Sequence, residues 1–146
     1  LHDRLAQIGA TLLIKAIAQM TDGTARRKKQ DPSGVTFAPL LKKETGKINW
    51  THKVSDIVNL IRGLSPTPAA YTFLDGLSLK IFSAIAQPGT IEQTPGMVGT
   101  LDITGLPVTA ADGCIVLKEV QLAGKKRMMI NDFLRGYHLK PGTVLG

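Results

Sequence analysis

Residues 69–84 read AAYTFLDGLSLKIFSA, which is two apolar stretches joined by Asp75-Gly76. An Asp-Gly pair between such stretches is a strong signal for the tight turn of a β-hairpin. The sequence therefore predicts a hairpin whose strands are residues 69–74 and 77–84. This hairpin decides the fold class, because it commits the middle of the chain to a β-sheet.

The β character continues toward the C-terminus. Further strands are predicted at Gly89–Glu92, Met97–Ile103 and Cys114–Gln121, with a turn at residues 111–113 and a short helix at Ile130–Gly136. Short strands accompanied by one or two small helices are typical of a compact Greek-key barrel. We therefore expect a mainly β fold with flanking helices, built as an OB-like Greek-key barrel.

Helical patterns precede the hairpin. Residues 1–20 carry apolar side chains at the spacing of one helical face, so they predict an amphipathic helix that ends at Thr21-Asp22-Gly23. A second helix is expected after Trp50, with Thr51 as its N-cap and Pro66 beyond its end. A short helical turn is expected at Leu40–Glu44. The first helix begins without an initiator Met or a capping residue, so we expect the chain to start inside a larger protein, whose absent domain buries that apolar face.

Positive charge is in excess and unevenly spread. The 146 residues contain 18 Lys and Arg against 11 Asp and Glu, and the isoelectric point is near 9.8. Residues 1–73 hold eleven of these bases and five of the acids, whereas residues 74–146 hold seven and six. Such a balance favours a polyanionic partner, although composition alone does not separate RNA, DNA and anionic lipid.

Three groups of cations are candidate phosphate contacts. The first is the run Arg26, Arg27, Lys28 and Lys29 in a charged linker, and the second is Lys125, Lys126 and Arg127 in an expected loop. Lys42 and Lys43, with Lys47 nearby, form a looser third group. Each group has a plainer interpretation as a solvated loop, because phosphate contacts leave no motif in a sequence.

The composition argues against several other functions. The single cysteine, Cys114, has no partner for a disulfide, and the three histidines are too scattered to predict a metal site. No catalytic or cofactor-binding residue is predicted, because no nucleophile or acid–base pattern is present. Because a lone cysteine cannot form an internal disulfide, a reducing cytoplasm is expected. Apolar runs are too short to span a bilayer, so no membrane partner is expected. Aromatic residues make up only 5% of the chain, which favours recognition of a duplex backbone over base stacking.

Several strings occur in a fixed order along the chain: LHDRLA at 1–6, KETGKINW at 43–50, IRGLSPTPA at 61–69, DG at 112–113, QLAGKKRM at 121–128 and DFLRG at 132–136. Together they resemble the C-terminal half of methionyl-tRNA formyltransferases. The chain departs from the family at Thr67, where members often carry an aromatic residue between the two prolines.

The resemblance implies three parts and a function. Residues 1–21 would be the last helix of a truncated formyltransferase domain, 22–34 a basic linker, and 35–146 an OB-like domain that binds initiator methionyl-tRNA. The family formylates that tRNA with 10-formyltetrahydrofolate, using catalytic and folate-binding residues upstream of Leu1, so the parent protein would be an enzyme and this chain alone inactive. Two alternatives stay open: a related folate-dependent small-molecule formyltransferase or hydrolase in which the barrel is a structural cover, and a barrel that only binds proteins. The oligomeric state is not predicted.

Overall fold

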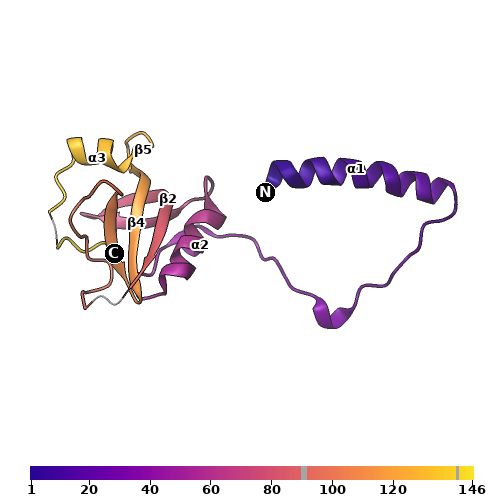
Figure 1. Cartoon of the computed structure of the whole chain (residues 1–146), viewed down its shortest axis with the longest axis horizontal. Helices are drawn as coiled ribbons and strands as arrows, with labels where there is room; N and C mark the ends of the chain where they lie inside the picture. The colour runs from indigo at the N-terminus through magenta and orange to yellow at the C-terminus, as the bar shows by residue number, and fades with distance from the viewer. Residues whose placement is uncertain (90–91, 141) are drawn as a thin grey trace. The chain divides into compact units, whose positions relative to one another are not determined.

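The computed structural model describes residues 1–89, 92–140 and 142–146, and the chain divides into two compact units, Leu1–Pro39 and Leu40–Gly146. The first unit contains helix α1, His2–Thr21, and a short 3-10 helix, η1, at Pro32–Gly34 (Figure 1). After α1, Gly23 has a φ of 71°, a left-handed conformation that glycine adopts without a steric penalty. The expected helix over residues 1–20 is therefore confirmed.

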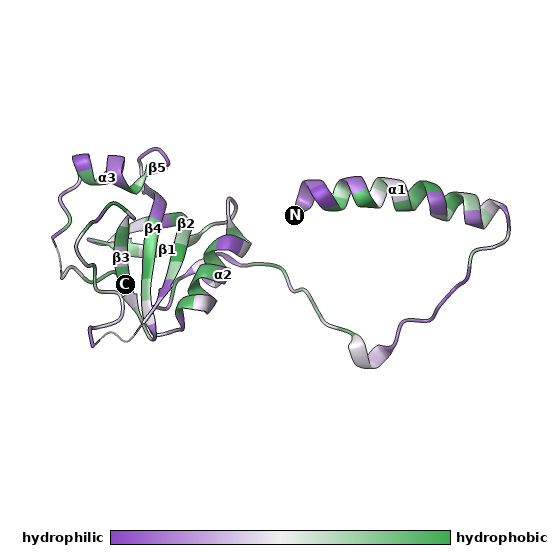
Figure 2. Cartoon of the chain, viewed as in Figure 1, coloured by the Kyte–Doolittle hydropathy of each residue, from purple (hydrophilic) through white to green (hydrophobic). Residues whose placement is uncertain are grey.

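The surface of α1 is open to solvent. No residue of this helix, which the structure describes throughout, is buried. Apolar and polar positions are interleaved along it (Figure 2), and large apolar side chains such as Leu12 and Ile17 are 58% and 54% exposed. A helix with an apolar stripe of this kind normally packs that stripe against another surface.

The second unit is built on an antiparallel sheet. Its strands are β1 (Ala70–Leu74), β2 (Leu77–Pro88), β3 (Leu106–Ala110), β4 (Gly113–Leu122) and β5 (Met128–Met129). They lie in the order β1-β2-β4-β3, and β5 also pairs with β4. The hairpin predicted at residues 69–84 is confirmed, because Leu74 pairs with Leu77 around Asp75 and Gly76. Both turn residues have positive φ, as the tightest hairpin turns require.

Helix α2, Val54–Leu64, covers one side of the sheet and contacts β2. Its apolar stripe is buried, with Val54, Ile57 and Ile61 at most 2% exposed. Trp50 lies in the same core, where its Nε1 donates a hydrogen bond of 3.1 Å to Thr72 Oγ1. Trp50 is therefore a core residue, and burial of a large apolar side chain is worth about 1.5–3 kcal/mol.

The start of α2 differs from the prediction. Thr51 does not cap the helix, because its backbone N–H and hydroxyl both bond to Asn49 Oδ1. The N-cap residue is Lys53, and the backbone N–H of Val54 donates to Asp112 Oδ1 at 2.7 Å. The helix is therefore capped by a carboxylate from the turn between β3 and β4, which is a long-range contact that no local pattern reveals.

The segment before β4 also corrects the sequence prediction. The prediction of a strand at Met97–Ile103 is wrong, because residues 97, 98 and 102 form only isolated bridges. The strand lies later in the chain, at Leu106–Ala110. The reason is a turn in which Asp102 Oδ1 accepts hydrogen bonds from the backbone N–H groups of Thr104 and Gly105. The strand expected at Gly89–Glu92 falls partly on residues 90 and 91, which lie outside the described residues.

Two further short elements complete the unit. A 3-10 helix, η2, spans Lys43–Gly46 and so overlaps the helical turn expected at Leu40–Glu44. Helix α3, Ile130–Gly136, confirms the C-terminal helix. The mainly β sheet with flanking helices is thus as expected, but the five named strands form an open sheet and not a closed barrel, because β1 and β3 lie at its edges without pairing with each other.

Candidate nucleic-acid interface

The four consecutive cations Arg26, Arg27, Lys28 and Lys29 lie in the first unit. They are exposed and belong to an irregular segment between α1 and η1. Among the described residues, none of these four forms an ion pair with a carboxylate. Their charges are therefore directed at solvent, where they are available to a polyanion.

A cleft of about 340 Å³ opens in the second unit between η2 and the strands β2 and β4. Two lysines, Lys43 from η2 and Lys80 from β2, line it. Strand pairing places Lys80 opposite Gln121 on β4 and opposite Tyr71 on β1. We call this feature the basic cleft; its lining residues are Lys43, Ser78, Lys80, Gln121, Leu122, Ala123 and Gly124.

Lys80 was not among the cations predicted from the sequence. Its neighbours Leu79 and Ile81 are buried, at 1% and 0% exposed, so Lys80 lies on the opposite, solvent-facing side of β2. The alternation of buried and exposed residues along β2 accounts for that outward position. Its approach to Lys43 depends on how η2 returns to the sheet, for which the sequence carries no signal. Lys42 directly precedes Lys43 and is the N-cap of η2. It is exposed, but it does not line the basic cleft.

The loop after β4 continues the positive surface. Gly124 takes a φ of 76°, and the backbone N–H of Lys125 donates to Leu122 O at 2.9 Å. Gln121 Nε2 in turn donates to Lys125 O at 2.9 Å, which ties the loop to a residue of the basic cleft. Lys125 and Lys126 are exposed. The structure therefore brings these two predicted cations next to the cleft that Lys43 lines.

Arg127 is used differently. Its Nε and one terminal nitrogen donate to the two carboxylate oxygens of Glu119 at 2.7 and 2.6 Å, a bidentate pair. The guanidinium also lies 4.2 Å from the ring centroid of Phe82. The hydrogen bonds from Arg127 lower the pKa of Glu119 below its ordinary range. The charge of this predicted contact is thus largely compensated within the protein.

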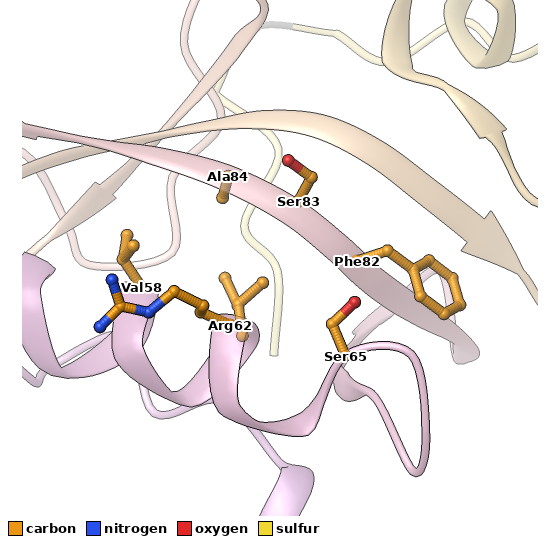
Figure 3. A pocket seen from close by; sticks show the side chains of 7 residues that line it. Val58, Arg62, Ser65, Phe82, Ser83 and Ala84 are labelled. Atoms are coloured by element: carbon orange, nitrogen blue, oxygen red, sulfur yellow. The ribbon is translucent and has the colours of Figure 1, made fainter. Parts of the chain in front are cut away.

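A second hollow, of about 370 Å³, lies between α2 and β2 (Figure 3). Apolar Val58 and Ala84 share it with the hydroxyl groups of Ser65 and Ser83. Arg62 also lines it, and its guanidinium donates to Asn59 Oδ1 at 2.9 Å. The positive charge of Arg62 is therefore not compensated by an ion pair in the described structure.

The described part of the chain contains side chains of the types that ligate metals or act as nucleophiles, including one cysteine, Cys114. No cluster of three or more His, Cys, Asp or Glu residues there is able to hold a metal ion. Burial raises the pKa of the Cys114 thiol, and a hydrogen bond with Thr109 only partly offsets this effect, so the thiol is not activated as a nucleophile. Across the described helices, none combines the length and apolar character needed to cross a bilayer.

Comparison with known proteins gives a consistent family match. The sequence profile of the family described as formyl transferase, C-terminal domain, matches residues 40–138. A methionyl-tRNA formyltransferase of Syntrophus aciditrophicus is 51% identical over 146 residues, which are 100% of this chain and 47% of that protein. The corresponding protein of Geotalea uraniireducens is 45% identical, again over 100% of this chain and 46% of its own length. The chain spans about half the length of these curated relatives.

Solved structures resemble the chain in fold. The crystal structure of HypX from Aquifex aeolicus, in complex with tetrahydrofolic acid, superposes with a TM-score of 0.60 and covers 84% of this chain and 22% of HypX. Sequence identity is 16%, so this likeness concerns the fold alone.

Proposed function

Because the chain belongs to the formyltransferase C-terminal domain family, we propose that it is the tRNA-binding portion of a methionyl-tRNA formyltransferase. The complete enzyme would transfer a formyl group from 10-formyltetrahydrofolate to the amino group of methionine on initiator tRNA, the first step that marks that tRNA for translation initiation. The curated relatives carry the name methionyl-tRNA formyltransferase, which favours this function over that of a small-molecule formyltransferase or hydrolase.

The observation that carries the proposal is the basic cleft with the exposed lysines beside it. Lys43 and Lys80 line one cleft, and Lys125 and Lys126 extend from the loop that forms its edge. Cations grouped at this scale bind phosphates of a nucleic-acid backbone and fix its register without reading bases. The module would therefore orient the tRNA so that its acceptor end reaches an active site elsewhere.

The same premise assigns the remaining parts of the chain. We propose that α1 is the last helix of a catalytic domain, whose surface would cover the apolar residues that are exposed here. The segment 22–34 would be a basic linker that adds phosphate contacts through Arg26–Lys29. Residues 35–146 would be the tRNA-binding domain, the folate donor would bind to the catalytic domain, and the enzyme would act in the cytoplasm.

We also propose that the open sheet is part of an OB-like barrel. Irregular segments extend the hydrogen bonding beyond β3: Thr109 N–H donates to Met97 O at 2.9 Å, and Val98 N–H donates to Thr143 O at 2.7 Å. The C-terminal segment then reaches the opposite edge, since Gly146 N–H donates to Phe73 O in β1 at 3.1 Å. These bonds connect the two edge strands, which supports a barrel closed by irregular segments.

The test of the proposed function is a pair of matched substitutions. The double variant Lys43→Gln/Lys80→Gln removes both lysines of the basic cleft, and we expect its tRNA affinity to fall several-fold. The slope of log affinity against log salt concentration would decrease by about 2, since each phosphate contact contributes about 0.9. Fluorescence titrations of tRNA across a range of salt concentrations measure both quantities.

Lys53→Gln is the control variant. Lys53 is exposed at the start of α2, next to the turn that contains Asp112, whereas the basic cleft lies at the other end of β4. We expect this variant to bind tRNA as tightly as the parent chain does. We also expect that neither the variants nor the parent chain catalyse formyl transfer alone. Binding that ignores salt, or equal losses in both variants, would contradict the proposal.

A further inference from the structure

The outer surface of β1 and β2 places aromatic and basic side chains next to each other. In β1 the half-buried Tyr71 and Phe73 alternate with three buried residues, so both rings lie on the side away from the core. Their centroids are 5.7 Å apart in an edge-to-face arrangement. Tyr71 pairs with Lys80, one of the two lysines that line the basic cleft.

Phe82 lies two residues beyond Lys80 on the same strand. The pairing of β2 with β4 is irregular between Ile81 and Ala84, a disturbance that often re-aims a side chain. Figure 3 shows the Phe82 ring projecting from β2 on the side of Ser65. Phe82 is half-buried, and its ring also lines the hollow between α2 and β2.

Cations accompany each of these aromatic residues. Lys47 Nζ lies 5.6 Å from the centroid of Phe73, and the Arg127 guanidinium lies over Phe82. Two carboxylates are near: Glu119, which is paired with Arg127, and Glu44 in η2, which is exposed. Lys43, Lys47 and Lys80 outnumber them, so the surface remains positive.

We propose that this surface, the aromatic face of Tyr71, Phe73, Lys80 and Phe82, stacks unpaired bases of a bound RNA while the lysines hold its phosphates. The inference rests on the proposed function, because it adds a second mode of contact to the same RNA-binding module. It changes the expectation drawn from composition: aromatic residues are few, at 5%, but the fold places Tyr71 and Phe73 together on β1, with Phe82 on the adjacent strand β2 under Arg127.

The charge and the rings together indicate the occupant. An aromatic ring offers a π-face that any base can stack on, and adjacent lysines bind the backbone, which is the combination that single-strand binders use. Bases within a duplex already stack on one another, so only unpaired nucleotides fit this mode. A protein partner would use the rings but would gain nothing from the lysines unless its own surface were acidic.

The test compares strands with equal charge. The 146-residue chain is titrated at low salt with a labelled RNA single strand of roughly twelve nucleotides, about the length that one OB-type domain covers. A second strand has the same number of phosphates but contains abasic sites, and intact tRNA is the third ligand. We expect the base-bearing strand to bind about tenfold more tightly than the abasic strand, as stacking predicts.

Substitutions then locate the preference. Phe73→Leu and Phe82→Leu are expected to reduce the preference for the base-bearing strand, whereas Phe37→Leu is a matched control, because Phe37 is 92% exposed in the first unit. Lys80→Gln is expected to weaken the binding of the base-bearing RNA and of the abasic RNA by the same factor. Circular dichroism verifies that each variant is folded. The comparison of base-bearing with abasic RNA uses the unsubstituted chain, so it does not depend on any variant.

Each outcome separates the two proposals. Equal binding of base-bearing and abasic strands would overturn the stacking proposal and leave phosphate binding intact. A preference that survives in both Phe73→Leu and Phe82→Leu would overturn the assignment to this surface. If neither the strands nor tRNA bound at low salt, the proposed function would fail together with the inference.

Discussion

In the first unit, four cations follow one another along an exposed segment, whereas in the second unit Lys43, Lys80 and Lys125 come from three different elements. The first group is complete in the sequence and needs no fold. The second group exists only because the sheet assembles it, so its function depends on the stability of the core. The comparison shows that exposed cations are grouped by a local run in one unit and by tertiary structure in the other.

The largest expected effect is on the stability of the fold that assembles the second group of cations. Ile81 in β2 is 0% exposed, and Ile81→Ala should lower the free energy of unfolding by about 2–5 kcal/mol because it removes buried methyl groups and leaves a cavity. Urea titration followed by the fluorescence of Trp50, which lies in the same core, measures this loss.

Ile17→Ala is the matched control in the first unit. Ile17 is 54% exposed on α1, so the same truncation there should change the unfolding of the Trp50 core by less than about 0.5 kcal/mol. Similar effects of the two substitutions on that transition would show that the two units do not differ as described.

The next effect concerns the local run. Replacing Arg26, Arg27, Lys28 and Lys29 by Gln should weaken tRNA binding by about tenfold at low salt and lower the salt slope by about 3 to 4. Unfolding of the Trp50 core should be unchanged, since none of these residues is buried. Titrations at several salt concentrations and urea denaturation test both statements, and an unchanged slope would remove the run from the interface.

Local patterns were enough to predict much of the fold. The Asp75-Gly76 hairpin, α1, α3 and β4 follow from spacing and turn chemistry within a few residues. The prediction failed where distant residues decide the outcome. Asp112 caps α2 across the fold, and the Asp102 turn delays β3 to Leu106. The hydrogen bond from Gly146 N–H to Phe73 O likewise joins segments that no short window contains.

The candidate site shows the same limit. A run such as Arg26–Lys29 is visible in the sequence, and so is the outward position of Lys80 on an alternating strand. The tertiary neighbours of a cation are not visible there: Glu119 in β4 pairs with Arg127 in the following loop, and η2 brings Lys43 to the cleft that Lys80 lines. Whether a cation is available to a ligand is therefore decided by tertiary neighbours, which composition does not record.

The smallest expected effect sharpens that last distinction, through Glu119→Gln. Hydrogen bonds from Arg127 depress the pKa of Glu119 in the folded chain, so the pair adds stability above the ordinary carboxyl value of about 4.3. That contribution is lost as the pH falls through the depressed pKa. The parent chain should therefore be slightly more stable than the variant near pH 7, and the difference should close below about pH 4.

Arg127→Gln should show the same closure, and the double variant should add little, because both substitutions remove one interaction. A difference that persists unchanged at pH 3 would contradict the role of the pair. The same variant also tests availability: Glu119→Gln releases a compensated cation beside Phe82, so the salt slope for tRNA should rise by up to about 0.9 if Arg127 then reaches a phosphate. A paired cation would thereby be converted into one that acts like the lysines of the basic cleft.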